Sequence, residues 1–344
     1  MNGYRRIQAA LRGEQPDTTP VMLHNFMLAA KEAGITMKQY RQNPDAIARC
    51  HIESVERYDL DGVLVDIDTA TLAGALGVPV ELPEDQPALS HGARLKVLEE
   101  VDDLEPVDIA RFGRVQVWLE AVRLLSRHFR DQVFIRGNCD QCAFSLAAMM
   151  RTPQEWMLDL MDEHNHARVH RLLEHCAEAT SQFIRLMAQT GAHMVSNGDS
   201  PAGPEMISPR LYRAFALPYE KLAVECAHAQ GRPYALHICG NTSLILDDML
   251  QSGADALELD FKTDTNLVRE KLEGRAAFIG NIDPNGVLAL GNPQLVETRT
   301  RELLACFTGN PRFILNAGCA IPPTTPPENI RSMIRTARRW QDSS

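Results

Sequence analysis

The sequence predicts a (β/α)8 barrel, an α/β fold, with a helical extension at its N-terminus and an insertion after its second strand. Three observations predict this fold: eight short apolar runs recur along the chain, stretches with helical periodicity separate them, and polar or glycine-rich loops follow them. Such alternation is typical of a parallel sheet, and eight units are enough to close a barrel. An open, doubly wound sheet is disfavoured because no Gly-x-Gly-x-x-Gly turn follows a strand.

The predicted strands and helices follow one another in regular order. The strands lie at residues 21–25, 62–66, 133–137, 193–197, 233–237, 256–259, 277–281 and 313–316. The helices lie at residues 45–58, 114–128, 167–190 (with a break considered), 211–229, 242–251, 265–272 and 295–307. Ser208 and Pro209 supply a cap and a first-turn proline for the fourth of these helices, and Gly231 follows its end.

Two segments lie outside the eight units. Residues 4–11 have an amphipathic pattern, which predicts a short helix that covers the bottom of the barrel. Residues 71–113 separate the second strand from the third and contain four prolines, so we expect an insertion that forms a subdomain or lid. The chain as a whole, residues 1–344, is expected to be a single barrel domain.

Composition and charge exclude several classes of function. Of the 344 residues 44% are hydrophobic, and 35 Lys and Arg against 45 Asp and Glu give a net charge of −10. No basic excess is present to neutralise phosphates, which argues against nucleic acid and anionic membranes as partners. No apolar run approaches the roughly 18 to 20 residues of a spanning helix. We therefore expect a cytoplasmic protein whose eight cysteines stay reduced, and the composition is compatible with a homo-oligomer.

Polar side chains gather where the predicted strands end. One histidine and three cysteines among them are discussed below. The others are His24, Asn25, Asp66, Asp68, Asn138, Asn197, Asp199, Glu258, Asp260, Asn281, Asp283 and Asn316. In barrels of this type, the active site lies at the carboxyl ends of the strands. We therefore place the active site at this mouth and expect His24, Asn25, Asn138 and Asn281 to bind a cofactor there.

The segment Leu236-His237-Ile238-Cys239-Gly240 is the sharpest local feature. Residues two apart on an extended segment face the same side, so His237 and Cys239 can face one ion. Cys319 follows the last strand on a glycine-bearing loop. Together the three side chains would form a nitrogen-sulfur-sulfur set that suits Zn²⁺ and leaves a fourth position open, as in catalytic sites. The alternative is that these thiols are buried and reduced, and pack as small hydrophobic groups.

A second cysteine pair, Cys139 and Cys142, has the Cys-x-x-Cys spacing of redox pairs and half zinc sites. It follows the third strand and has no second such pair, so we expect it to line a loop or pocket, with a regulatory thiol or an accessory ligand as alternatives. The four cysteines in helical patterns are expected in the core: Cys50, Cys176, Cys226 and Cys306.

Six short motifs carry a family resemblance. They lie at residues 202–209, 218–219, 237–241, 280–284, 318–322 and 325–329. Together they resemble the uroporphyrinogen decarboxylase superfamily, and the similarity extends from the first helix to about Arg338. Within that superfamily, the His-x-Cys motif and the late Gly-Cys resemble the zinc-dependent cobamide methyltransferases, typified by methylcobamide:coenzyme M methyltransferase.

The sequence departs from the decarboxylases of the superfamily at two places. Their arginine-rich stretch after the first strand, which holds the substrate carboxylates, reads Leu23-His24-Asn25-Phe26-Met27 here, and their late Gly-His-Gly reads Gly318-Cys319-Ala320. Asp66 matches the position of their catalytic aspartate, which keeps a uroporphyrinogen decarboxylase-like reaction as an alternative. A highly charged anionic substrate without its arginine clamp is disfavoured.

The resemblance to the cobamide methyltransferases implies a reaction and a partner. Zinc on the three ligands would help a substrate thiol to lose its proton, and the thiolate would take the methyl group of a methylcobamide. Asp199, Glu258 or Asp260 would orient the thiol or a ligand. Because the chain lacks an Asp-x-His-x-x-Gly corrinoid signature, the corrinoid would arrive on another protein.

Two further alternatives remain open from the sequence. In the first, the chain is a demethylase that passes a methyl group from a small methylated compound to the corrinoid. In the second, it is a noncatalytic protein that holds metal, tetrapyrrole or corrinoid in the same barrel.

Overall fold

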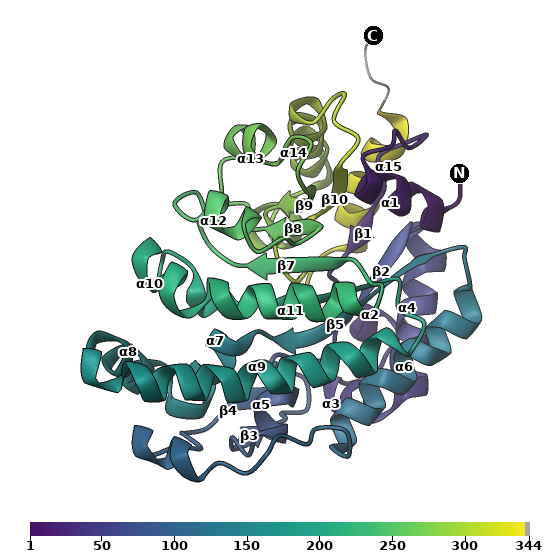
Figure 1. Ribbon diagram of the computed structural model, residues 1–344. Helices are drawn as coiled ribbons and strands as arrows, with labels where there is room; N and C mark the ends of the chain where they lie inside the picture. The colour runs from purple at the N-terminus through teal and green to yellow at the C-terminus, as the bar shows by residue number, and fades with distance from the viewer. Residues whose placement is uncertain (341–344) are drawn as a thin grey trace.

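Eight parallel strands form a barrel at the centre of the computed structural model, which describes residues 1–340 (Figure 1). The strand order is β1-β2-β5-β6-β7-β8-β9-β10, so each strand lies beside the next barrel strand in the chain. A parallel bridge between Val21 and Leu315 joins the first strand region to the last. The predicted (β/α)8 barrel is confirmed.

All eight predicted strands are present, and a short hairpin adds two more. The barrel strands are β1 Met22–Leu23, β2 Gly62–Val65, β5 Phe134–Gln141, β6 Met194–Gly198, β7 Tyr234–Ile238, β8 Ala256–Leu259, β9 Ala277–Ile282 and β10 Phe313–Ala317. The hairpin consists of β3 Val80–Glu81 and β4 Leu89–Ser90, which pair antiparallel.

Helices surround the barrel and connect its strands. The α-helices are α1 Gly3–Arg12, α2 Phe26–Glu32, α3 Met37–Gln42, α4 Pro44–Tyr58, α5 Thr71–Ala75, α6 Gly113–Phe129, α7 Ala143–Arg151, α8 Pro153–Met161, α9 His166–Ala188, α10 Pro209–Phe215, α11 Leu217–Ala229, α12 Leu246–Leu250, α13 Thr265–Leu272, α14 Pro293–Cys306 and α15 Pro327–Arg339. Three 3-10 helices, η1 Leu98–Asp103, η2 Glu163–Asn165 and η3 Ser200–Ala202, and a π-helix, η4 Pro284–Ala289, complete the connections.

Several helices differ from the sequence prediction. The predicted helix at residues 211–229 divides at Ala216 into α10 and α11 because Pro218 has no N–H for a continuous helix. Conversely, α9 runs without a break. Helix α12 begins four residues later than predicted. Helices α2, α3, α5, α7, α8 and α15 were not predicted.

Helix α1 closes the bottom of the barrel, as predicted. Its Ile7 and Ala10 are fully buried in a cluster with apolar side chains from the lower ends of the strands, among them Met22, Phe134 and Ile314. Burying each large apolar side chain stabilises the fold by roughly 1.5–3 kcal/mol. Apolar side chains therefore fill the lower part of the barrel, and the polar residues of the interior lie above this layer.

Both ends of the described chain are fastened to the barrel through Asp61. This carboxylate is 1% exposed and accepts hydrogen bonds from the Val21 N–H (2.8 Å), from Arg6 of α1 (2.9 Å) and from Arg338 of α15 (2.7 Å). Figure 1 shows α1 and α15 on the same side of the molecule. The three contacts join the first helix, the start of the barrel and the last helix.

The segment after β2, residues 71–113, holds α5, the β3–β4 hairpin and η1 before α6 begins. Arg41 of α3 fixes this segment by donating to the main-chain carbonyls of Pro83 and Gln86. The next two residues, Pro87 and Ala88, reach the cavity described below. That this segment acts as a lid stays a prediction.

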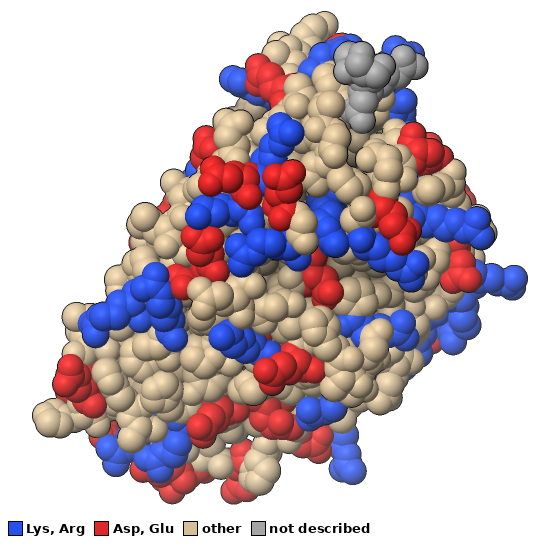
Figure 2. Space-filling model, turned by 45° about the horizontal axis from the view of Figure 1, so that its top comes forward, with Lys and Arg blue, Asp and Glu red and all other residues tan. Residues whose placement is uncertain are grey.

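The surface carries charges of both signs. On the face shown in Figure 2, Lys and Arg are interspersed with Asp and Glu. Within residues 1–340, none of the helices combines the length and apolar character needed to cross a membrane.

Candidate active site

A cavity of about 260 Å³ lies at the mouth of the barrel, above the polar ends of the strands. Its apolar lining comes from Phe26, Met27, Leu64, Ile67, Pro87, Ala88 and Ala320. Its polar lining includes His24, Arg41, Asp66, Asp68, Arg136, Asn138, Asp140, Gln141, Ser200, His237, Cys239, Glu258 and Cys319. The predicted location of the site at the strand ends thus coincides with a cavity.

Three side chains from distant parts of the chain meet in this cavity. His237 Nε2 lies 3.0 Å from Cys239 Sγ, which lies 3.5 Å from Cys319 Sγ. Their ligand atoms all fall within 4.8 Å of one another. Among residues 1–340, no other group of three His, Cys, Asp or Glu residues is arranged in this way. The structure therefore brings together the residues predicted to bind metal.

Hydrogen bonds around His237 orient its ring for coordination. Nδ1 lies 3.0 Å from the main-chain carbonyl of Glu258, which can only accept, so Nδ1 carries a proton, and in the neutral ring Nε2 has the lone pair. Such a second hydrogen bond is typical of metal-bound histidines because it fixes the tautomer and the ring. The nitrogen that faces the two sulfurs is thus the one free to bind a metal.

The charges in the site favour an anionic sulfur at Cys239. The Cys319 thiol donates a hydrogen bond to this sulfur. This hydrogen bond, together with His237, lowers the pKa of Cys239 to about 3, although burial alone would raise it. The same hydrogen bond raises the pKa of Cys319. Burial alone would lower the pKa of His237, but the neighbouring Cys239 raises it to about 9. One nitrogen and two sulfurs, partly ionised and close together, are the donor set that Zn²⁺ prefers.

A buried ion pair lies beneath the three candidate ligands. Arg136 of β5 and Glu258 of β8 are 2% and 0% exposed, and their side chains meet at 2.6 Å. The other Glu258 oxygen accepts from Asn316 Nδ2 at 2.8 Å. Burial would raise the pKa of Glu258, but Arg136 and His237 lower it to about 2. Glu258 is therefore an anion held by an arginine at the centre of the barrel.

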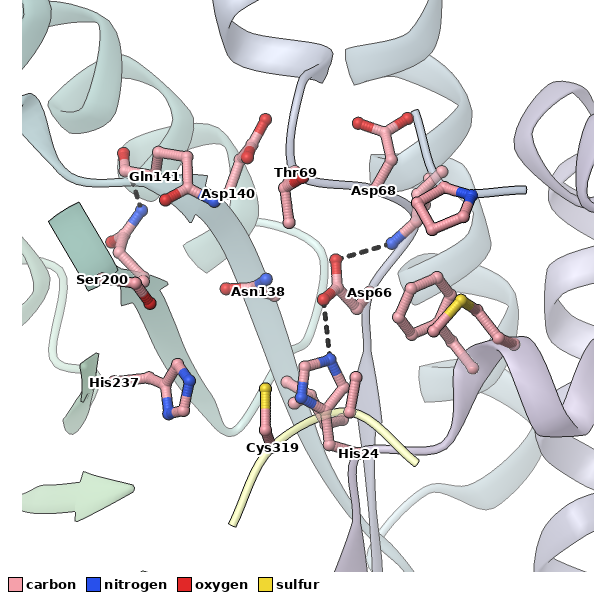
Figure 3. Close-up of a pocket in the computed structure, with 18 of the residues that line it drawn as sticks. His24, Asp66, Asp68, Thr69, Asn138, Asp140, Gln141, Ser200, His237 and Cys319 are labelled. Carbon is pink, nitrogen blue, oxygen red and sulfur yellow. Dashed lines mark hydrogen bonds and ion pairs between the residues drawn. The ribbon is translucent and has the colours of Figure 1, made fainter. Parts of the chain in front are cut away.

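A histidine–aspartate pair forms another wall. His24 Nε2 lies 2.8 Å from Asp66 Oδ2, and Asp66 Oδ1 accepts from the Ile67 N–H (Figure 3). His24 Nδ1 is buried and has no hydrogen-bond partner within the described part of the chain. The pair combines a carboxylate that orients an imidazole with a ring nitrogen that has no partner among the described residues.

Four residues predicted for cofactor binding or for orienting the substrate lie outside this cavity, and one of them is Asp260, whose carboxylate accepts from the N–H groups of Gly240 and Lys262. Asn25 donates to Ser54 Oγ of α4, and Asn281 donates to the main-chain carbonyl of Asp260. Asp199 accepts from the N–H and the hydroxyl of Ser145, and burial raises its pKa to about 6. Of the residues predicted for cofactor binding or catalysis, His24, Asn138, Asp66 and Glu258 line the cavity, whereas Asn25, Asn281 and Asp199 do not.

The remaining cysteines are apart from the cavity. Cys139 and Cys142 are buried, do not line it, and have pKa values raised by burial. Cys142 contacts the hydroxyl of Tyr234 at 3.4 Å. Of the four helical cysteines, Cys50 and Cys176 are buried as expected, while Cys226 and Cys306 are only partly buried.

Sequence reasoning missed several residues of the site. Arg136 lies in the middle of a predicted strand, and Arg41 lies on a helix that the sequence did not reveal. Asp140 lies past the predicted end of the third strand, next to the last residue of the longer β5. A charged residue inside an otherwise apolar strand, such as Arg136 between Ile135 and Gly137, was the one available signal for a buried ion pair.

The fold and the site together define a (β/α)8 barrel with a candidate metal centre of one histidine and two cysteines at its mouth. The family model described as uroporphyrinogen decarboxylase (URO-D) matches residues 3–340. The chain therefore belongs to the uroporphyrinogen decarboxylase family, as its motifs predicted.

Relatives with two different activities in their names match the chain. It is 28% identical over 284 residues to methylcobamide:CoM methyltransferase MtbA of Methanosarcina mazei, with 82% of this chain and 80% of that protein covered. It is 28% identical over 350 residues to uroporphyrinogen decarboxylase of Trichodesmium erythraeum, with 96% and 94% covered. The solved structure of a methyltransferase from Methanosarcina mazei has the same fold, with a TM-score of 0.89 at 23% identity over 98% of both chains.

Proposed function

We propose that this chain is a zinc-dependent methyltransferase that moves a methyl group between a corrinoid, carried on a separate protein, and a small thiol or other small acceptor. The observation that carries the proposal is the convergence of His237, Cys239 and Cys319 in the cavity. Similarity to the methylcobamide:CoM methyltransferases supports the same class of reaction. The proposal assigns the three side chains to the metal and the rest of the cavity to the small substrate.

The residues present fit a zinc ion. His237 offers Nε2, Cys239 has a low pKa, and Cys319 lies within reach of the same point. When bound, zinc lowers the pKa of a thiol at its open position, so that the sulfur is anionic near neutral pH. Three protein ligands leave that position open to a substrate.

The His24–Asp66 pair is suited to receive the proton that the substrate thiol loses. Asp66 holds Nε2, which leaves Nδ1 of His24 as the proton acceptor. A His24→Gln variant is expected to slow methyl transfer about 100-fold or more while the zinc content stays unchanged. An unchanged rate would exclude this role for His24.

The size and charge of the cavity favour a small substrate over a tetrapyrrole. Its volume of about 260 Å³ is below the range of roughly 300–1,000 Å³ that is typical for drug-sized ligands. Its two arginines are already engaged, Arg41 by main-chain carbonyls and Arg136 by Glu258. A porphyrinogen with several carboxylates would find only Arg41 without a carboxylate partner here, although Asp66 and the decarboxylase relatives keep decarboxylation as the second candidate.

Zinc stoichiometry is the first test. Wild type is expected to hold about one zinc per chain, and Cys239→Ala and Cys319→Ala are expected to lose it. Cys306→Ala is the matched control, because Cys306 lies on α14 and its thiol contacts the Thr265 carbonyl. A zinc-free wild type, purified without chelators and offered zinc, would contradict the proposal.

An activity assay then separates the candidate reactions. Demethylation of methylcobalamin by a thiol would support the proposed transfer, and methylation of cob(I)alamin by a methylated compound would support the demethylase direction. Loss of carboxyl groups from uroporphyrinogen would favour the decarboxylase. Zinc binding with none of these reactions would favour a noncatalytic binding protein.

A further inference from the structure

The charged side chains that line the cavity are all buried. Each Asp, Glu, Arg and His of the lining is at most 9% exposed. Arg41, Arg136, Asp68 and Asp140 are at most 3% exposed. A ligand in the cavity therefore finds almost no charged surface to contact.

Apart from the metal candidates, the side chains of the lining that keep accessible surface carry no charge. They are Met27, Pro87, Ala88 and Ala320, which are apolar, and Thr69, Asn138, Gln141 and Ser200, which are polar and neutral. Binding sites for small molecules are typically of this kind, with apolar walls and a few polar groups that fix the orientation of the ligand.

Two buried anions of the lining already have partners inside the protein. Glu258 meets Arg136 at 2.6 Å, and Asp66 meets His24 Nε2 at 2.8 Å. Asp66 also accepts from the Ile67 N–H. A charged ligand would have to compete with these contacts.

Arg41 and Asp68 compensate each other's charge. Burial lowers the pKa of Arg41, and Asp68 is the strongest of the neighbouring charges that oppose this shift. The terminal nitrogens of Arg41 donate to the carbonyls of Pro83 and Gln86, and Asp68 Oδ1 accepts from the Ala70 N–H at 2.9 Å. Both groups thus have an opposite charge nearby and hydrogen bonds to the main chain.

Asp140 adds no charge that a ligand could use. Burial and Asp68 raise the pKa of Asp140 well above its usual range, with Arg114 acting in the opposite sense. Asp140 Oδ2 accepts from the Leu72 N–H at 2.7 Å. A buried carboxyl group that keeps its proton near neutral pH is uncharged.

The apolar surface lies across the cavity from His237. Met27 lies on α2, which follows β1, and residues 87–88 belong to the insertion after β2. In the ring of eight strands, β7, which carries His237, lies opposite β1. Figure 3 shows His237 on one side of the cavity and Asp66, which follows β2, on the other. A substrate that reacts beside His237 therefore extends toward apolar side chains.

We propose that the small substrate is uncharged apart from the atom that exchanges the methyl group. Its short carbon body lies against Met27 and residues 87–88, and one polar atom, such as a hydroxyl or ether oxygen, meets the neutral polar side chains. A formal charge on this body would lose its water and gain no free partner, which is costly. This inference rests on the proposed function for the reacting end of the substrate. The charge of the rest of the substrate depends on the lining alone.

Calorimetric titration of the zinc-loaded protein tests the inference with three thiols that share a two-carbon chain. They are 2-mercaptoethanol, which is neutral, cysteamine, which carries an ammonium group, and 2-mercaptoethanesulfonate, which is an anion. We expect 2-mercaptoethanol to bind at least tenfold more tightly than either charged thiol. A preference below threefold, or tighter binding of either ion, would overturn the inference and leave the proposed function standing.

Asp68→Asn tests the compensation of charge directly. This variant keeps the shape of the side chain and removes the anion that faces Arg41. The affinity for the sulfonate relative to 2-mercaptoethanol should therefore rise at least fivefold. Asp103→Asn, at an exposed position of η1, is the matched control and should keep the wild-type ratio. An unchanged ratio in Asp68→Asn would contradict the inference, because the cavity would then tolerate an uncompensated arginine.

Probes without a thiol separate this inference from the proposed function. 1-Butanol, butylammonium and butanesulfonate share a four-carbon chain, and their binding requires no reaction at the metal. In ligand-observed NMR with the protein as purified, 1-butanol should bind at least threefold more tightly than both ions. That result would support the inference even if no thiol binds and the proposed function fails. An ion that binds as tightly as 1-butanol would refute the inference, whatever the outcome for zinc and methyl transfer.

Discussion

Replacing Glu258 by Gln tests whether the ion pair beneath the site is structural. Glu258 and Arg136 meet at 2.6 Å in a place with almost no solvent exposure, and Nε and Nη1 of Arg136 already lack partners within the described chain. The variant leaves the guanidinium with a neutral amide instead of a carboxylate. Removing one member of a buried pair destabilises a protein by about 3–5 kcal/mol, a large share of a total of roughly 5–15 kcal/mol.

Urea unfolding of matched variants measures this cost. Glu258→Gln is expected to lose about 3–5 kcal/mol, whereas Glu225→Gln, at an exposed position of α11, should change stability by less than about 0.5 kcal/mol. Adding Arg136→Met to Glu258→Gln removes the unpaired charge and should recover much of the loss. The zinc content should persist under folding conditions, because the hydrogen bond of His237 Nδ1 goes to the main-chain carbonyl of residue 258, while the side-chain carboxylate lies 3.7 Å away.

Two results would refute this reasoning. A loss below about 1 kcal/mol in Glu258→Gln would mean that water or neighbouring groups already solvate Arg136. A double variant no more stable than the single one would mean that the cost does not come from the unpaired guanidinium. In either case Glu258 would return to the role that the resemblance implied, which is to orient the thiol or a ligand.

Three further predictions concern stability, pH and the metal loop. Asp61→Ala should destabilise the protein by about 2–4 kcal/mol in urea unfolding, because it removes hydrogen bonds to Val21, Arg6 and Arg338. Asp59→Asn should have little effect, because this side chain is 91% exposed and Asn tolerates the left-handed backbone of this position. Burial lowers the pKa of His51 from 6.5 to about 4, so the unfolded state binds a proton at a higher pH than the folded state. The wild type should therefore lose up to about 3 kcal/mol of unfolding free energy as the pH falls from 6.5 to 4. Unfolding at several pH values should show a shallower loss in His51→Gln, and equal slopes would contradict the assignment. Gly318→Ala should weaken zinc binding at least tenfold in a chelator competition, because its new Cβ would lie 2.6 Å from the Phe261 main-chain nitrogen and displace Cys319, while Gly113→Ala, with open space around it, should bind zinc like wild type.

The strands were predictable because each is an apolar run that ends in a polar loop, and all eight are present. Their exact lengths were less predictable. Strand β1 has only two residues, since Asn25 already precedes α2. Strand β5 runs on to Gln141 through polar residues and a register shift after Asn138, which an apolar pattern does not reveal.

The metal candidates were predictable for a geometric reason. His237 lies at the end of one strand with Cys239 just beyond it, and a closed parallel barrel places the end of its last strand, which precedes Cys319, at the same mouth. The opposite end of the cavity was not predictable. Asp140 depends on the extra length of β5, and the engagement of Arg41 depends on carbonyls of the insertion.

Closure of the barrel bottom by α1 has a consequence for the order of events at the mouth. Ile7 and Ala10 fill the lower opening, so small molecules enter and leave the cavity by the upper one. A protein that presents a corrinoid to the reacting end of the substrate must approach from that same side. Under the proposed function, the small substrate has to be in place before the larger partner covers the entrance, and its methylated form leaves only after the partner has withdrawn. Topology alone would thus impose a compulsory sequence of binding and release.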